Sequence, residues 1–193
     1  MNSPFSNRKL QRYFASISEE QFSNYCEELG CCIPTNRFDA VYMMLHMLRH
    51  VLDEGVGLRQ LLDYYYLLIK MTPQEKDQAI KDIQQLGILG FASGMMFVMQ
   101  EVLGVGQSIL LCSPDAKQGA FLLEEIMLSG NFGRFDKRNA HEKNESHIRH
   151  ARRKLRRALR FLKYYPGEVL FMPAFMAWQY FWRRKNGYFY KGK

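Results

Sequence analysis

Two histidines, His46 and His50, have a spacing that could support chemistry. Residues four apart lie on one face of a helix, so the two imidazoles could hold a metal ion, with Asp39 or Asp53 as a third ligand. The glutamate of an HExxH zinc site is missing from this stretch, and histidines that line a packed helix are commoner than metal ligands. We therefore expect no metal at these positions.

Charged residues stand close to these histidines along the chain. Arg49 lies near the apolar stripe of the same predicted helix, which indicates a buried side chain paired with Asp63 or Glu54. Arg59 and Asp63 are again four residues apart and could form a structural salt bridge. The predicted polar cluster consists of His46, Arg49, His50, Arg59 and Asp63.

Six closely spaced arginines in the C-terminal third could bind an anion. They are Arg149, Arg152, Arg153, Arg156, Arg157 and Arg160. The net charge of the chain is +8, and residues 137–163 alone hold 11 basic and two acidic residues. Clustered arginines can bind nucleic acid or an acidic surface. A helix face that is merely solvated can have the same composition, so this interpretation stays open. Because aromatic residues are not interleaved with the arginines, we expect binding to nucleic acid to be weak and non-specific.

The four cysteines, Cys26, Cys31, Cys32 and Cys112, include no Cys-x-x-Cys pair, so we expect no zinc site. The first residues lack the basic and then apolar pattern of a signal peptide. The sequence contains no run of about 18 apolar residues, so we expect no transmembrane helix. These features predict a reducing, cytoplasmic location.

Apolar periodicity and helix-ending residues predict a mostly α fold, a multi-helix bundle with at most a short N-terminal β-hairpin at residues 22–33. A short helix is expected at residues 4–16. The main helices are expected at about residues 36–52, 58–70, 73–86, 88–103, 114–130, 141–164 and 169–182. The first of these is apolar nearly all round, which is typical of a central helix.

Two other helices have a single predicted packing face. The helix at 58–70 places Leu58, Leu61, Leu62, Tyr65, Leu68 and Ile69 on one side. The helix at 141–164 has a narrow apolar stripe made of Ile148, Ala151, Leu155, Ala158, Leu159 and Leu162. We expect both faces to be buried.

The length of 193 residues, 47% of them hydrophobic, predicts one core and a single helical domain, residues 1–193. Within it we distinguish an N-terminal extension (1–35), a helical core (36–136), and a basic helix followed by an aromatic C-terminal helix (137–193).

Four stretches resemble a known family. They are AVYMMLHMLRHVLDEGVGLRQLLDYYYLL from Ala40 to Leu68, LGILGFA from Leu86 to Ala92, GNFGRFD from Gly130 to Asp136, and RALRFLKYYPGEVLFMP from Arg157 to Pro173. In order and spacing they resemble the C-terminal helical region of the uncharacterised nucleotidyltransferase family of Bacteroidetes. Members of this family carry a catalytic domain ahead of these helices, with a Gly-Ser turn and acidic residues that hold Mg²⁺ and a nucleoside triphosphate.

This chain has no Gly-Ser turn and no Asp-x-Asp or Asp-x-Glu pair. The resemblance therefore implies a non-catalytic helical domain, truncated from or related to such a bacterial protein, that supports or partners a nucleotidyltransferase domain. Mg²⁺ and nucleoside triphosphate are expected only with that missing domain, and a second copy of the chain is the alternative partner. By resemblance, Arg59 and Asp63 would lie near the nucleotide in a full-length protein. A basic module that binds nucleic acid or an acidic surface is the alternative function.

Overall fold

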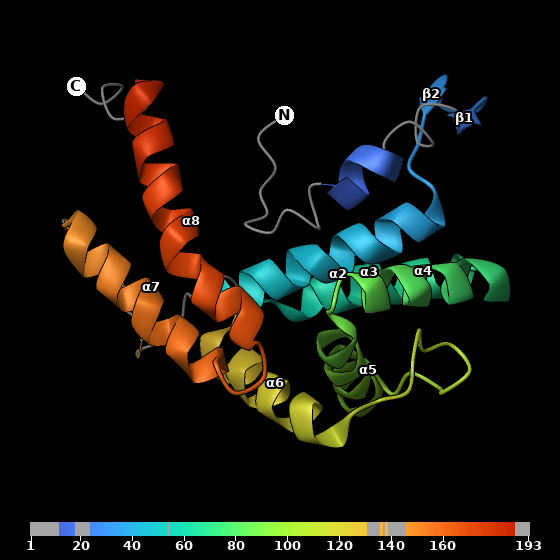
Figure 1. The fold of residues 1–193 in the computed structure, drawn as a ribbon. Coiled ribbons are helices and arrows are strands. Elements are labelled where there is room, and N and C mark those ends of the chain that lie inside the picture. The colour runs from blue at the N-terminus through green and yellow to red at the C-terminus, as the bar shows by residue number, and fades with distance from the viewer. Residues whose placement is uncertain are drawn as a thin grey trace. The chain divides into compact units, whose positions relative to one another are not determined.

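The computed structural model of the chain describes residues 12–17, 24–53, 55–130, 136, 138 and 146–187. Its described residues are mostly helical, which confirms the predicted fold class (Figure 1). Residues 12–17 form part of the expected first helix, whereas residues 4–11, most of the GNFGRFD stretch and residues 141–145 lie outside the described residues. In the described ranges, the only strands are β1 (Tyr25–Cys26) and β2 (Cys31–Cys32), an antiparallel hairpin in which Cys26 pairs with Cys31.

The chain divides into two compact units. One spans Lys9–Ala140 and contains the hairpin and the helices α2 to α6, and the other contains α7 and α8. The division near Ala140 falls close to the predicted boundary between the helical core and the basic C-terminal part. No helix among the described residues has the length and apolar character needed to cross a membrane.

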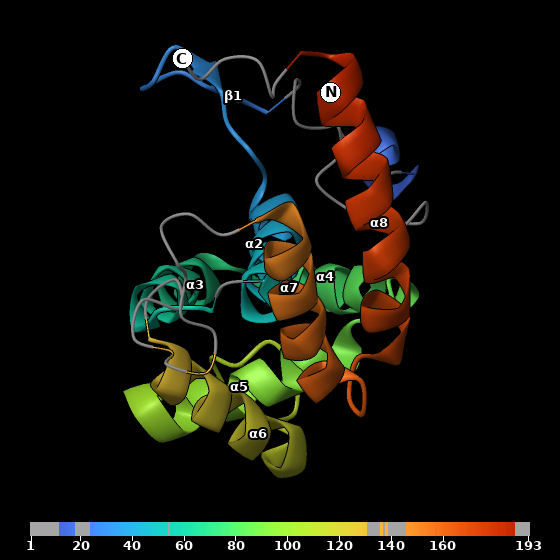
Figure 2. The ribbon, with the colours of Figure 1, turned by 90° about the vertical axis from the view of Figure 1, so that its left-hand side faces the viewer.

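Helix α2 (Asn36–Asp53) is the central helix of the first unit, as its sequence predicts. It packs against α3 (Leu58–Lys70) and α4 (Pro73–Gln85), and Figure 2 shows it between these two helices. The fully buried Tyr64 of α3 donates a hydrogen bond to the carbonyl of Ala40 in α2, 3.2 Å away. This bond satisfies a hydroxyl that would otherwise be costly to bury.

Helix α4 begins as predicted. Thr72 accepts a hydrogen bond from the backbone N–H of Glu75, and the Glu75 carboxylate accepts one from the backbone N–H of Thr72, 2.7 Å away. Pro73 occupies the first helical position. These reciprocal bonds satisfy two backbone donors that a helix start leaves open.

Close helix packing joins α5 (Leu89–Leu103) to α6 (Ala116–Ser129). A Cβ atom on Gly94 would lie 2.8 Å from Leu122, and one on Gly119 would overlap Phe97. Glycine is therefore required for this approach, because any larger side chain would push the two helices apart.

The core of this unit is rich in methionine. Met44, Met47, Met95, Met96 and Met99 are all almost completely inaccessible to solvent. The thioether of Met96 also accepts a hydrogen bond from the backbone N–H of Leu111 at 3.2 Å. Methionine fills irregular gaps between helices well because its side chain is unbranched and flexible.

The predicted packing face of α3 is only half correct. Leu61 and Leu68 are buried, but Leu58, Leu62 and Ile69 are exposed, and Tyr66 is 57% exposed. The buried side of the helix also includes Tyr64 and Leu67, which lie outside the predicted packing face. An apolar stripe is therefore left on its outer side.

In the second unit, α7 (His147–Phe161) packs against α8 (Pro166–Lys185). Tyr165 and Val169 near the start of α8 are buried, together with Ala158 and Phe161 of α7. Of the predicted apolar stripe of α7, Ala158 is buried, but the large side chains are not, since Ile148 is 75% and Leu159 is 55% exposed. The prediction that this stripe packs was therefore wrong for its large residues.

Candidate functional site

The predicted polar cluster is partly assembled on the outer side of α2. His46 is exposed and His50 is half-buried, and their Nε2 atoms lie 3.0 Å apart. The two rings meet edge to face, with centroids 4.4 Å apart. Together with Arg49 and Asp53 they line a shallow depression of about 270 Å³. We take this depression as the candidate site of the first unit.

Stacked rings along α2 orient His46. The Tyr42 ring is stacked on the ring of Phe38, with centroids 5.9 Å apart and planes inclined by 8°. On its other side it is stacked on His46, with centroids 5.9 Å apart and planes inclined by 14°. Phe14 adds edge contacts to Phe38 and Tyr42. The i,i+4 spacing of the helix thus produces one aromatic row that ends in the two histidines.

Electrostatics favour a neutral His46. Partial burial of the ring, and then the charges of His50 and Arg49, lower the pKa of His46 below its ordinary value. A hydrogen bond between two Nε2 atoms needs one donor and one acceptor, so the pair cannot be fully protonated while the bond persists. Neutral imidazoles can accept a hydrogen bond, relay a proton or ligate a metal. In the described part of the chain, no group of three or more His, Cys, Asp or Glu side chains could hold a metal ion.

The other residues of the predicted cluster lie elsewhere. Arg59 and Asp63 are exposed on α3 and do not line the depression. Within the described residues, no ion pair joins them, so the salt bridge expected from their spacing is not formed. Arg49 is half-buried rather than buried, and Glu54, one of its two expected partners, lies outside the described residues. Asp39 does not line the depression either.

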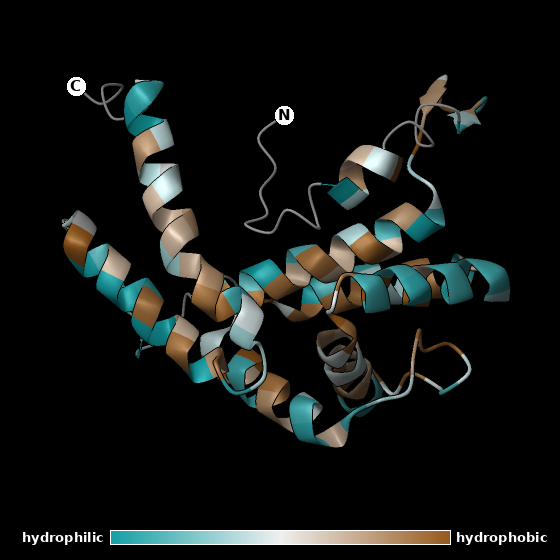
Figure 3. Ribbon diagram, viewed as in Figure 1, coloured by the Kyte–Doolittle hydropathy of each residue, from teal (hydrophilic) through white to brown (hydrophobic). Residues whose placement is uncertain are grey.

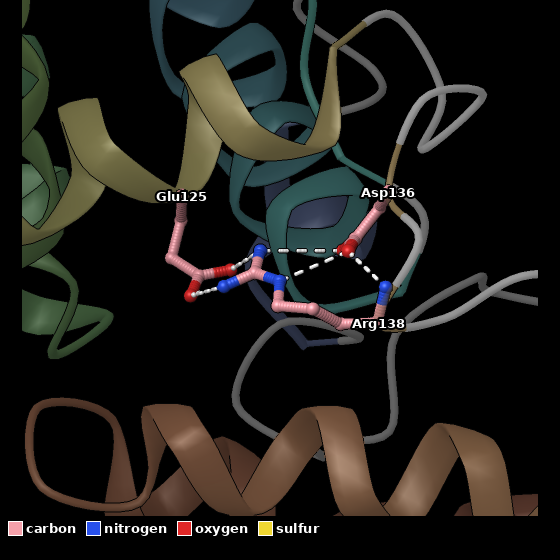
Figure 4. Close-up of polar contacts among 3 residues, drawn as sticks. All are labelled: Glu125, Asp136 and Arg138. Carbon is pink, nitrogen blue, oxygen red and sulfur yellow. Dashed lines mark hydrogen bonds and ion pairs between the residues drawn. The ribbon is translucent and has the colours of Figure 1, made fainter.

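A second polar cluster was not predicted and lies at the end of α6 (Figure 4). The Arg138 guanidinium donates two parallel hydrogen bonds to the carboxylate of Glu125, at 2.9 and 3.0 Å. Its Nε atom donates to Asp136 at 2.9 Å, and the backbone N–H of Arg138 donates to the same carboxylate oxygen at 3.0 Å. These contacts hold Arg138, and through it Asp136, against α6.

Both carboxylates of this cluster are buried, with Glu125 5% and Asp136 3% exposed. The hydrogen bonds that Arg138 donates to Asp136, and then those that it donates to Glu125 together with the negative charges of both carboxylates, raise the pKa of Arg138. One guanidinium therefore compensates two buried carboxylates, which is stable only while all three side chains are in place. The arrangement is a structural clamp, because its donors and acceptors are directed at one another.

Asp82 forms another buried ion pair in this unit. It accepts hydrogen bonds from Nε and Nη2 of Arg37, at 2.6 and 3.0 Å, and from the hydroxyl of Tyr13 at 2.9 Å. These bonds connect the helical residues 12–17 and α2 to α4. Asp82 is 5% exposed, so this carboxylate also serves the fold.

The six predicted anion-binding arginines of α7 differ in exposure. Arg149, Arg152 and Arg156 are exposed, whereas Arg153 and Arg160 are half-buried. Arg157 is buried, with its guanidinium carbon 5.8 Å from the centre of the Phe161 ring. Arg157 therefore lies on the packing side of α7 and not on its exposed arginine face.

Sequence reasoning missed the Glu125, Asp136 and Arg138 clamp because its members are separated by a Gly-rich stretch. The one available signal was the Asp-x-Arg spacing of Asp136 and Arg138, which suits an aspartate that bonds the backbone two residues on. Comparison with known proteins found no matching family model, no matching curated protein and no matching solved structure. The resemblance to the nucleotidyltransferase family therefore stays a prediction.

Proposed function

We propose that this chain is a non-catalytic helical domain that supports or partners a nucleotidyltransferase domain. The observation that supports the proposal is the apolar stripe on the outer side of α3, formed by Leu58, Leu62, Tyr66 and Ile69. At 100° per residue these four side chains fall within about 80° of one another around the helix. An exposed stripe of this kind marks a surface that another protein covers.

The surroundings of the stripe fit a protein interface. Arg59 and Asp63 lie beside Tyr66 on the same helix and are exposed, so a charged rim borders the apolar centre. Most of helix α3, from Leu58 to Leu68, also lies in the stretch Ala40–Leu68, on which the family resemblance mainly rests. A catalytic domain that covered the stripe would bring Arg59 and Asp63 to its edge, where they could approach a nucleotide.

The catalytic groups would come from the partner. Nucleotidyl transfer needs carboxylates that bridge metal ions to the phosphates, and the chain has no Asp-x-Asp or Asp-x-Glu pair. Mg²⁺ and the nucleoside triphosphate would thus bind to the partner domain. No disulfide joins Cys26, Cys31, Cys32 and Cys112, which fits a reducing cytoplasm, and the family resemblance suggests a bacterial one.

The test measures binding of the chain to a nucleotidyltransferase domain from the family that the chain resembles, supplied as a separate protein. We expect Leu62→Asp with Tyr66→Asp to weaken this binding at least about tenfold, because the centre of the interface would gain two buried charges. Gln84→Asp is the matched control, since Gln84 is an exposed residue of α4.

Two results would overturn the proposal. One is that the unaltered chain does not bind the catalytic domain at all. The other is that the chain alone, with Mg²⁺ and labelled nucleoside triphosphates, transfers label to an acceptor.

A further inference from the structure

Helix α7 exposes its apolar side, whereas an ordinary amphipathic helix buries that side against its neighbours. Its exposed residues include most of the apolar stripe: Ile148, Leu155, Leu159 and Leu162. Figure 3 shows α7 as alternating brown and teal segments along its length, which is the mixture of apolar and charged residues in its sequence. Water therefore faces several large apolar side chains on one helix, an arrangement that costs free energy until another surface covers them.

The opposite side of the same helix is the packed one. Arg157, Ala158 and Phe161 are buried there, and the Arg157 guanidinium lies over the Phe161 ring. Packing thus uses a buried arginine and an aromatic ring, while the leucines stay outside. The apolar stripe is available for an external partner because the fold of this unit does not use it.

Positive charge borders this stripe. Arg152, Arg156 and Arg149 are exposed, and at 100° per residue they follow directly after Leu159 around the helix. Residues 146–187 contain 11 lysines and arginines and one acidic residue, Glu168. The partner that complements such a surface is negatively charged and also offers apolar contact.

Helix α8 repeats this combination. Leu170, Phe171 and Phe181 are exposed along it, and Trp178 is about half exposed. Its last turn carries Arg183, Arg184 and Lys185. Two neighbouring helices thus both present apolar side chains next to basic ones.

We propose that α7 and α8 bind the surface of a bilayer containing anionic phospholipids, with the apolar residues at the acyl boundary and the arginines on the headgroups. A basic helix with one apolar face binds in this way without spanning the membrane. Nucleic acid would satisfy the arginines but leave Ile148, Leu155 and Leu159 in water, since its outer surface is phosphate and sugar. The inference is independent of the proposed function, because α3 belongs to the other unit.

The chain contains a suitable probe for the test. Its two tryptophans, Trp178 and Trp182, both lie in α8, so tryptophan fluorescence reports on this unit alone. The full chain is titrated with vesicles of phosphatidylcholine, with and without phosphatidylglycerol. We expect a blue shift of the emission, quenching by brominated lipid, and binding at least about tenfold tighter to the anionic vesicles.

Matched variants separate the two contributions. Arg152→Gln with Arg156→Gln should weaken binding to anionic vesicles by about 25-fold, since each arginine near the surface contributes about fivefold. Leu155→Gln with Leu159→Gln should weaken it at least about tenfold, because the apolar face is lost. Circular dichroism checks that both variants keep their helices. Ile148→Gln removes a third apolar side chain of the stripe and should also weaken binding to the anionic vesicles. Because Ile148 is 75% exposed and lies in the first turn of α7, this substitution should leave the fold intact.

The same measurements can overturn the proposal. No binding to anionic vesicles, or equal binding to neutral ones, contradicts it. So does tight binding to RNA or DNA that depends on Arg152 and Arg156 but not on Leu155 and Leu159, because that pattern identifies a nucleic-acid partner. Binding to a protein that the leucine variants abolish, with no binding to vesicles, identifies a protein interface instead.

Discussion

The two units of the chain differ in which apolar and charged residues they bury. In the unit Lys9–Ala140, most apolar residues of α2 are buried, and the buried carboxylates Glu125 and Asp82 each face an arginine. In the unit of α7 and α8, leucines are exposed and one arginine is buried. The first unit pairs its buried charges internally and leaves an apolar stripe exposed on α3, whereas the second exposes apolar area together with positive charge on both of its helices.

Apolar residues on the helices of this chain can therefore serve either folding or binding. The side chains of α2 contribute to folding because neighbouring helices cover them. The exposed Ile148, Leu155 and Leu159 of α7 contribute little to folding while they remain in water, so we expect them to contribute to binding. Substitutions that compare the two units test this distinction directly.

The largest contrast is expected between two apolar truncations. Leu45→Ala, at a buried position of α2, should lower the free energy of unfolding by about 2 to 5 kcal/mol, because it creates a cavity. Ile148→Ala in α7 should change it by less than about 0.5 kcal/mol, because the side chain is already in water. Chemical denaturation followed by circular dichroism measures both. A large loss for Ile148→Ala would mean that the stripe is packed after all.

The clamp at the end of α6 should be nearly as sensitive. Arg138→Gln leaves the buried carboxylates of Glu125 and Asp136 without their cation, and we expect a loss of about 3 kcal/mol in the free energy of unfolding. Adding Glu125→Gln should recover part of the loss, since one buried charge is then removed. Equal stability of the single and double variants would show that the charges do not interact as described.

Helix packing between α5 and α6 gives a smaller effect. Gly119→Ala should cost about 1 to 3 kcal/mol, because the added methyl group overlaps Phe97 and the helices must separate. Gly106→Ala is the control, since a Cβ there meets nothing within 4 Å. Thermal denaturation of the two variants should therefore diverge, and similar melting temperatures would argue against the close approach.

The smallest expected effect concerns pH and the depression on α2. The pKa of His46 is lowered in the folded state, so the stability that its neutral ring contributes is complete above the ordinary value of 6.5 and is lost as the pH falls through the folded value. His46→Gln should reduce the loss in the free energy of unfolding at mildly acidic pH by less than about 1 kcal/mol, because solvent screens an exposed ring. Denaturation curves recorded from neutral to mildly acidic pH would show it. Parallel curves for the two proteins would exclude a role for His46.

Helix positions could be predicted from the sequence because local signals determine them. The Thr72, Pro73 and Glu75 pattern starts α4 where expected, and the all-round apolar character of α2 indicates its central place. The rotation of α3 and α7 could not be predicted in the same way. Periodicity shows which residues share a face, but which face is covered depends on neighbours far away in the sequence.

The candidate site was predictable only where it is local. His46, Arg49 and His50 are one helical turn apart, so the helix itself brings them together. Arg59 and Asp63 have the same favourable spacing, yet solvent competes for both charges and no bond forms between them. Glu125 and Arg138 are 13 residues apart, and this spacing does not determine that they meet.

The methionine-rich core has a consequence for how the first unit can be observed. The thioethers of Met44, Met95 and Met99 are shielded from solvent in the folded state. Peroxide can convert them to sulfoxides only in molecules that have opened, since the oxidant must reach the sulfur. The rate at which each buried methionine gains oxygen, followed by mass spectrometry and compared with the rate in the unfolded chain, would thus report the fraction of molecules in which its part of the helical core is open.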